Sequence, residues 1–217
     1  MIPYKSTFIN YADEGSGPVV VLLHGYLETL DIWGTFAEEL SKTFRVITMD
    51  IPGHGKSGKI SEIHTVDILA EALEYLLHSL HISKAFFIGH SMGGYTVLSY
   101  LARNPMKVSG ICLFHSTPFA DTEQKKVARS QEIELVREGK LKSFIPANVV
   151  KSFATDNLER LKDKVEWAEK IAFQNKPEGI IALLDEISDQ AHDRYGIAGL
   201  LELDAEEGPA DDTSSTN

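Results

Sequence analysis

One short segment, residues 89–93, constrains the fold of this chain more than any other. Its sequence Gly-His-Ser-Met-Gly follows an apolar run of strand length at residues 85–88 and opens a helical stretch that Asn104 and Pro105 end. A strand that enters a helix through G-x-S-x-G turns so tightly that the serine takes a strained conformation and the flanking glycines avoid a clash. The segment predicts a strand–turn–helix unit with Ser91 at its tip.

Ser91 is therefore the candidate for a covalent catalytic nucleophile. Its place at a helix N-terminus aims unpaired amide groups at an oxyanion that develops beside it, and the backbone N–H of Met92 is the natural first donor. The alternative is a serine that only caps the helix after a strand. The glycine spacing and a second motif upstream favour the nucleophile.

That second motif is Leu-Leu-His-Gly-Tyr at residues 22–26, again at the carboxyl end of an apolar strand, where open α/β sheets build their sites. Gly25 permits a sharp turn, so that the backbone N–H of Tyr26 or Leu27 can supply a second oxyanion donor facing Met92. His24 is predicted to be a structural histidine that bonds loop carbonyls, in preference to a role in proton transfer.

A third block, residues 50–57, reads Asp-Ile-Pro-Gly-His-Gly-Lys-Ser. It is rich in glycine, as phosphate-binding loops are, but only one residue separates Gly53 from Gly55. The order G-x-x-x-x-G-K-[ST] is absent, and the block therefore does not predict nucleotide binding.

Strands and helices alternate over the first half of the chain. Strands are expected at residues 8–11, 19–23, 44–49, 85–88 and 108–114, and helices at 31–40, 62–81 and 91–103. This β-α-β order predicts an α/β fold, with a doubly wound, mostly parallel sheet and helices on both faces.

The pattern changes after Pro118, where helices are expected at 122–139, 158–173 and 177–187 with no strand between them. We divide the chain into a core at residues 1–118, a helical insertion at 119–187 and an atypical tail at 188–217. From Asp185 onward there are ten acidic residues and one basic residue, whereas residues 1–184 have 22 acids and 20 bases. The end of the tail has almost no large apolar residue and is expected to be disordered.

Composition narrows the partners. A net charge of -11 disfavours nucleic acid and anionic membranes, which both require a basic surface. The chain has no apolar stretch of the roughly 18 to 20 residues that span a bilayer and no signal-peptide pattern at its start, so a cytoplasmic protein is expected. The single cysteine, Cys112, fits a reducing compartment and is expected to be a small buried core residue.

Together the three blocks resemble the α/β-hydrolase superfamily, in its esterase-like branch, over residues 8–184. The resemblance implies that Ser91 attacks an acyl carbon of a small-molecule substrate, with the Tyr26 and Met92 amides as the oxyanion hole and with no cofactor or metal. The helical insertion resembles the family's cap, which covers the acyl pocket. Four aromatic residues of the cap either line that pocket or pack within the cap: Phe144, Phe153, Trp167 and Phe173.

The resemblance also implies a histidine base and an acid after the cap, each following a further strand. Downstream of residue 184 the sequence has neither strand, and its one histidine is His192. His115, at the end of a predicted strand, and Asp121 are the other candidates for base and acid. The fold is therefore expected to be incomplete at the C-terminus. We hypothesise truncation or a shifted reading frame, which translation of the other two frames past codon 184 would test.

Three functional hypotheses follow. The first is a serine hydrolase that cleaves a small ester or related acyl compound through an acyl-enzyme. The second is a catalytically impaired member of the fold, with a binding role or none. The third is a poorly stable or self-associating chain, because two missing strands would expose an apolar sheet edge. The sequence leaves the substrate and the oligomeric state open.

Overall fold

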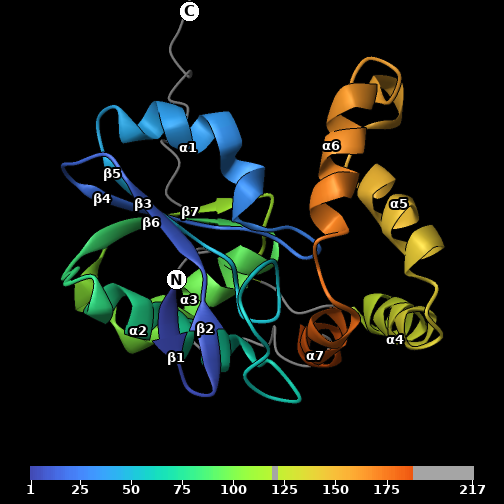
Figure 1. The fold of residues 1–217 in the computed structure, drawn as a ribbon, viewed down its shortest axis with the longest axis horizontal. Helices are drawn as coiled ribbons and strands as arrows, with labels where there is room; N and C mark the ends of the chain where they lie inside the picture. Colours follow the sequence, from blue (N-terminus) through green and yellow to red (C-terminus); the bar gives the residue numbers. More distant parts are fainter. Residues whose placement is uncertain (119–121, 188–217) are drawn as a thin grey trace, which may run out of the picture.

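The computed structural model of the chain describes residues 1–118 and 122–187. A five-stranded sheet forms its centre, with helices above and below and a further group of helices to one side (Figure 1). The strands lie in the order β3 (Tyr11–Glu14), β5 (Arg45–Met49), β4 (Val19–Leu23), β6 (Ala85–His90) and β7 (Val108–Phe114). Only β3 is antiparallel to its neighbour. The prediction of a doubly wound, mostly parallel sheet is confirmed.

The predicted first strand at residues 8–11 is in fact two strands that separate at Asn10. A hairpin of β1 (Ile2–Tyr4) and β2 (Thr7–Ile9) precedes this residue, and β3 follows it. The backbone N–H of Asn10 donates to Ser57 Oγ at 2.9 Å, and its side chain donates to Asp50 Oδ2 at 2.8 Å. Because Asn10 bonds to this loop, the chain passes from the hairpin to the main sheet at that point.

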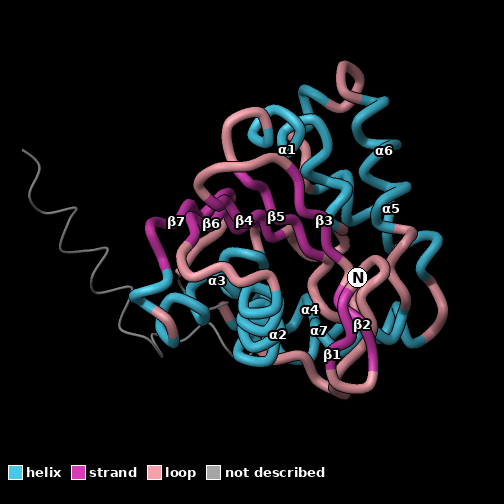
Figure 2. Tube along the Cα trace, turned by 60° about the vertical axis from the view of Figure 1, so that its left-hand side comes forward, coloured by secondary structure: helices cyan, strands magenta, loops and turns pink. Residues whose placement is uncertain are grey.

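Helices cover both faces of the sheet, as Figure 2 shows from a second angle. A 3-10 turn (Leu30–Trp33) and α1 (Gly34–Ser41) lie on one face, and α2 (Val66–Ser79) and α3 (Met92–Arg103) lie on the other. In β4, Val20 and Leu22 pack toward α1, while Val21 and Leu23 pack toward α2 and α3. An uninterrupted apolar run is what a strand buried on both faces requires.

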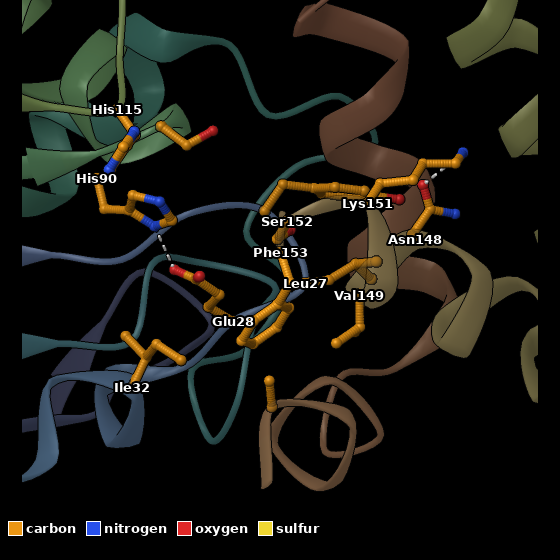
Figure 3. A pocket seen from close by; sticks show the side chains of 13 residues that line it. Leu27, Glu28, Ile32, His90, His115, Asn148, Val149, Lys151, Ser152 and Phe153 are labelled. Carbon is orange, nitrogen blue, oxygen red and sulfur yellow. Dashed lines mark hydrogen bonds and ion pairs between the residues drawn. The ribbon is translucent and has the colours of Figure 1, made fainter. Parts of the chain in front are cut away.

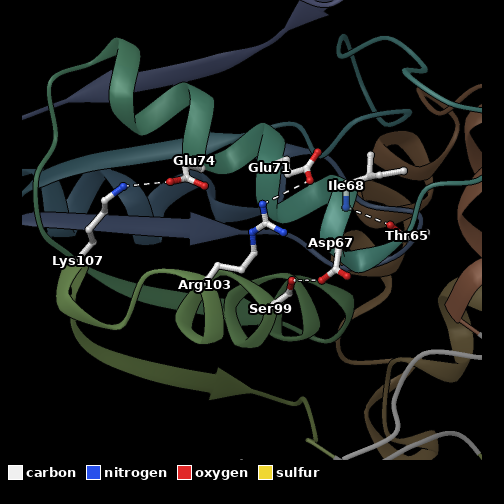
Figure 4. Close-up of polar contacts among 8 residues, drawn as sticks. All are labelled: Thr65, Asp67, Ile68, Glu71, Glu74, Ser99, Arg103 and Lys107. Carbon is white, nitrogen blue, oxygen red and sulfur yellow. Dashed lines mark hydrogen bonds and ion pairs between the residues drawn. The ribbon is translucent and has the colours of Figure 1, made fainter. Parts of the chain in front are cut away.

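Helix α2 begins later than the sequence predicts, at Val66, because the Thr65 side chain accepts a hydrogen bond from the Ile68 N–H and caps the helix (Figure 4). On the apolar face of α2, Leu69, Leu73 and Leu76 are fully buried, and burial of this apolar surface stabilises the packing of the helix. Polar pairs along the rim join α2 to α3 and the 3-10 turn Pro105–Lys107: Asp67 with Ser99 (2.7 Å), Glu71 with Arg103 (3.4 Å) and Glu74 with Lys107 (3.0 Å). These contacts fix α3, which begins directly after Ser91.

The helices after residue 121 form a second core of their own. They are α4 (Glu123–Arg137), α5 (Leu141–Lys151), α6 (Lys162–Ala172) and α7 (Pro177–Ile187), with a 3-10 turn at Thr155–Asn157 before α6. Helix α5 is missing from the sequence prediction, because it contains Pro146 and has only a weak amphipathic pattern. The predicted helix at 158–173 begins at Lys162 in the structure.

Helix α7 and the turn before it attach this helical group to the sheet. The His64 N–H donates to the Ala182 carbonyl oxygen at 2.7 Å, and the Gly55 N–H donates to Asn175 Oδ1 at 2.9 Å. Leu183 is fully buried in the main core. The helical group is therefore held beside the loops that follow β4 and β5.

Cys112 is exposed, so the prediction of a buried core cysteine was wrong. On the face opposite α3, the side chains of Ile88, Cys112 and Phe114 line an apolar hollow of about 340 Å³ with Trp33 and Phe36. Helix α1 packs over β4 and β5, and no other described helix covers β6 and β7 on this face. Among the described strands, β7 also forms one edge of the sheet.

No described helix is both long enough and apolar enough to cross a bilayer. The predicted tail, 188–217, lies outside the residues that the structure describes, as do Asp121 and His192.

Candidate active site

Ser91 stands at the turn between β6 and α3, as the motif predicts. Its φ of 48° and ψ of -115° lie in a region that side-chain-bearing residues rarely adopt. Three hydrogen bonds hold this conformation: the Ser91 N–H donates to the Phe114 carbonyl at 3.0 Å, and the Ser91 carbonyl accepts from Gly94 N–H at 3.0 Å and from Ser116 Oγ at 2.7 Å. Strands β6 and β7 and helix α3 thus position the hydroxyl together.

The glycines of the motif are required by close packing. A Cβ on Gly89 would lie 2.5 Å from the amide nitrogen of Gly94, and one on Gly93 would overlap the carbonyl oxygen of Leu23 at the end of β4. Real Cβ atoms do not approach backbone atoms so closely. The absent side chains let α3 start directly against β4 and β6.

The two predicted oxyanion donors flank the serine. Met92 is the first residue of α3, where an amide has no partner within the helix, and Tyr26 lies in the loop after β4. Within the described residues, neither the Tyr26 N–H nor the Met92 N–H donates a backbone hydrogen bond in the loops and helix caps. Leu27 has a φ of 59°, which turns the chain sharply just after Tyr26. The arrangement leaves both amides available to an acceptor.

His24 bonds to the backbone of its own loops, as predicted. Its Nε2 accepts from the Ile51 N–H at 2.9 Å, so Nδ1 carries the proton and donates to the Gly25 carbonyl at 2.8 Å. The side chain is fully buried, and burial lowers its pKa. A neutral histidine with both nitrogens occupied joins the loops after β4 and β5.

The Asp-Ile-Pro-Gly-His-Gly block is also built as a structural loop. The buried Asp50 carboxylate accepts hydrogen bonds from the Leu30 N–H (2.7 Å), the Lys56 N–H (2.9 Å) and the Asn10 side chain. These three donors bind a carboxylate of the protein itself, whereas the donors of a phosphate-binding loop bind the phosphate of a ligand.

Ser91 opens onto a cavity of about 580 Å³ between the sheet and the helical group. The loops at the carboxyl ends of the strands form one wall and α5, the segment after it and α6 form the other (Figure 3). The lining residues are Tyr26, Leu27, Glu28, Ile32, His90, Ser91, His115, Asn148, Val149, Lys151, Ser152, Phe153 and Ala168. The wall from the helices is mixed, with Val149, Phe153 and Ala168 beside Asn148, Lys151 and Ser152, whereas Glu28, His90 and His115 make the wall around Ser91 polar.

Glu28 and His90 form a hydrogen-bonded contact in this cavity that sequence reasoning missed. Glu28 Oε2 lies 2.8 Å from His90 Nδ1 and also accepts from the Gly25 N–H at 2.6 Å (Figure 3). Both side chains are mostly buried, with 19% and 25% of their surface exposed. The available signals were a glutamate four residues after His24 and a histidine directly before Ser91, but sixty-two residues separate the pair.

The structure places one of the three candidate partners of Ser91. His115 follows β7 with a φ of 45° and lines the same cavity, whereas His192 and Asp121 are outside the described residues. Within the described part of the chain, Ser91 Oγ forms no hydrogen bond to a histidine. The neighbouring histidines are therefore near the serine without direct contact.

Among the four aromatic residues singled out in the helical group, Phe153 lines the cavity. Phe144 is buried in the core of the helical group, while Trp167 and Phe173 are 40% and 47% exposed. The sequence left open whether these residues line the cavity or pack among the helices. The structure gives the first place to Phe153 and the second to Phe144.

Comparison with known proteins agrees with this architecture. The model of the alpha/beta hydrolase fold family matches residues 18–168. The esterase of Thermogutta terrifontis superposes with a TM-score of 0.79 and 26% sequence identity, over 85% of this chain and 68% of the esterase chain. The chain therefore belongs to the α/β hydrolase fold family.

Two curated relatives show how varied the family is. The sn-1-specific diacylglycerol lipase ABHD11 of Danio rerio is 29% identical over 161 residues, which are 73% of this chain and 50% of the lipase. The dihydrolipoyllysine-residue acetyltransferase component of the acetoin cleaving system of Pseudomonas putida is 39% identical over 103 residues, 48% of this chain and 28% of the relative. The chain thus spans half or less of the length of these two relatives.

Proposed function

We propose that this protein is a serine hydrolase that cleaves a small ester or related acyl compound through an acyl-enzyme on Ser91. The observation that carries the proposal is the strained Ser91 at a helix N-terminus, open to a 580 Å³ cavity. Ser91 Oγ attacks the acyl carbon, and the developing oxyanion accepts hydrogen bonds from the Tyr26 and Met92 amides. The alcohol leaves with the proton that Ser91 gives up, and water then attacks the acyl carbon, breaks its bond to Ser91 Oγ, and restores the serine hydroxyl as the acid is released.

We further propose that residues 119–187 act as a cap that selects the acyl group. Val149 and Phe153 give the helical side of the cavity an apolar patch between polar residues, and Ile32 adds an apolar side chain from the sheet side. An apolar acyl chain placed against this patch brings its carbonyl carbon to the polar side of the cavity. This arrangement supports the proposed division into a core at residues 1–118 and a cap.

Hydrolysis of p-nitrophenyl esters with acyl chains of increasing length tests both parts. We expect turnover by the folded protein, a preference among chain lengths that changes in Phe153→Ala, and loss of turnover in Ser91→Ala. Circular dichroism of each variant shows that the fold is retained. Equal turnover by the wild type and Ser91→Ala would refute the role of Ser91.

A second candidate is a binding protein that keeps the hydrolase architecture. The observation in its favour is that, in the described residues, Ser91 Oγ has no hydrogen bond to an imidazole. This reading predicts saturable binding of a small acyl compound that survives Ser91→Ala, without ester turnover. Calorimetric titration of both proteins with a non-hydrolysable acyl amide separates the two functions.

A further inference from the structure

The helical side of the Ser91 cavity carries a positive charge that the proposed reaction does not use. Among the described residues that line the cavity, Lys151 is the one lysine or arginine, and Glu28 is the one acid. Glu28 accepts from the Gly25 N–H and contacts His90, whereas no carboxylate in the described part of the chain forms an ion pair with Lys151. Lys151 is exposed, so its ammonium group is available to a negatively charged ligand.

Asn148 holds this ammonium group at the wall of the cavity. Its Nδ2 donates to the Phe144 carbonyl at 3.1 Å, one turn earlier in α5, and its Oδ1 accepts from Lys151 Nζ at 3.4 Å (Figure 3). Phe144 is buried in the core of the helical group, which anchors Asn148. A lysine ammonium has three N–H donors, so two remain for a ligand after the contact with Asn148.

Apolar side chains lie between this ammonium group and the polar side of the cavity. Figure 3 shows Phe153 and Val149 between His90, which directly precedes Ser91, and Lys151 on the far side. An apolar chain gains free energy by burial against such a patch, whereas a charge at the end of that chain requires a partner. The arrangement fits a molecule with a reactive carbonyl at one end, methylene groups in the middle and an anion at the other end.

We propose that the acyl group of the substrate ends in a carboxylate and that Lys151 recognises it; this inference rests on the proposed function of Ser91. The scissile carbonyl lies at Ser91, the methylene groups lie against Val149 and Phe153, and the carboxylate accepts hydrogen bonds from Lys151 Nζ. Asn148 is a positioning residue for the ammonium group. The substrate is thus a half-ester of a dicarboxylic acid, and its hydrolysis with one water molecule yields the dicarboxylate and an alcohol.

Lys151 also contributes to the structure of the helical group. With Asn148 it lines a second cavity of about 240 Å³, which Glu132 of α4 lines as well. Burial raises the pKa of Glu132, and the positive charge of Lys151 acts against that rise. Lys151 is in addition the last residue of α5, where a cation stabilises the C-terminus of a helix. A role limited to these contacts would affect stability and leave substrate preference unchanged.

Paired esters test the inference. The p-nitrophenyl half-esters of glutaric, adipic and suberic acid are each compared with the neutral p-nitrophenyl ester of the same chain length. We expect kcat/KM of the wild type to be about 5-fold higher, or more, for at least one half-ester than for its neutral partner. Lys151→Gln loses this preference through KM, and Lys151→Arg retains it. Lys142→Gln is the matched control, because Lys142 is an exposed lysine of α5 outside the cavity lining.

Ionic strength and stability separate recognition from a structural role. Added salt should weaken the preference in the wild type and have no such effect in Lys151→Gln. Neutral esters that are turned over as well as the half-esters at every chain length would overturn the inference and leave Ser91 as nucleophile. So would an unchanged preference in Lys151→Gln, including the case in which that variant unfolds at lower urea concentration. Absence of turnover of every ester by the folded wild type would overturn the proposed function, and the inference with it.

Discussion

Acid is expected to destabilise this protein through histidines that are buried in the neutral form. His24, His54 and His64 are almost completely buried, and burial lowers the pKa of each, to about 4 for His64. The unfolded chain binds protons near the ordinary value of 6.5, whereas the folded His64 does so only near 4. Stability is therefore fully present above about pH 6.5 and is lost as the pH falls toward 4.

The magnitude for His64 follows from the two pKa values. A difference between 6.5 and about 4 corresponds to about 3 kcal/mol in total, of which about 2 kcal/mol is lost between about pH 7 and about pH 5. His24 and His54 add losses in the same direction. Glu132 acts in the opposite direction, because burial raises its pKa. A comparison of variants cancels the groups that His64 does not influence; among the histidines, His54 also responds, because the charge of His64 contributes to its lowered pKa.

Urea unfolding at constant ionic strength measures this effect. The free energy of unfolding is determined at about pH 7 and about pH 5 for the wild type, His64→Asn and the surface control His78→Asn. We expect the loss between the two pH values to be about 2 kcal/mol smaller in His64→Asn than in the other two proteins. An equal loss of unfolding free energy in all three proteins would refute the role given to His64.

Two further predictions concern the backbone around the serine. Gly93→Ala should lower the free energy of unfolding by about 2 to 4 kcal/mol, because the added methyl group overlaps the Leu23 carbonyl. Gly139→Ala is the control, because nothing lies within 4 Å of the added methyl group and only φ is unfavourable. It should lower the free energy of unfolding by about 1 kcal/mol in the same urea titration. Ser116→Ala removes the 2.7 Å hydrogen bond to the Ser91 carbonyl and should lower the free energy of unfolding by about 1 kcal/mol. Ester turnover should fall by a larger fraction than the free energy of unfolding does. Equal costs at Gly93 and Gly139, or unchanged turnover in Ser116→Ala, would contradict these explanations.

The sequence predicted the elements that local patterns specify. Strand burial and tight turns restrict the residue types allowed, so β4 and β6 could be located from the apolar runs at 19–23 and 85–88. The turn that carries Ser91 could be located from the glycines around it. The prediction failed where the deciding contact is distant. Asn10 ends a strand because it bonds to Asp50, forty residues away.

The site shows the same division. The place of Ser91 followed from its motif, whereas the contact between Glu28 and His90 depends on how two loops meet, which neither segment encodes alone. Cys112 was misjudged for a related reason: an apolar strand pattern predicts burial, but burial also requires a covering element, and none of the described helices covers that face of β7. Helix α5 escaped detection because Pro146 and a weak apolar stripe hide its period.

The most direct test of the central claim is covalent labelling of Ser91. A fluorophosphonate probe reacts with an activated serine hydroxyl, and peptide mass spectrometry identifies the residue that carries it. We expect folded protein to be labelled at Ser91, heat-denatured protein to stay unlabelled, and Ser91→Ala to abolish the label. Folded protein that stays unlabelled, or that is labelled at another serine, would contradict the role of Ser91 as nucleophile.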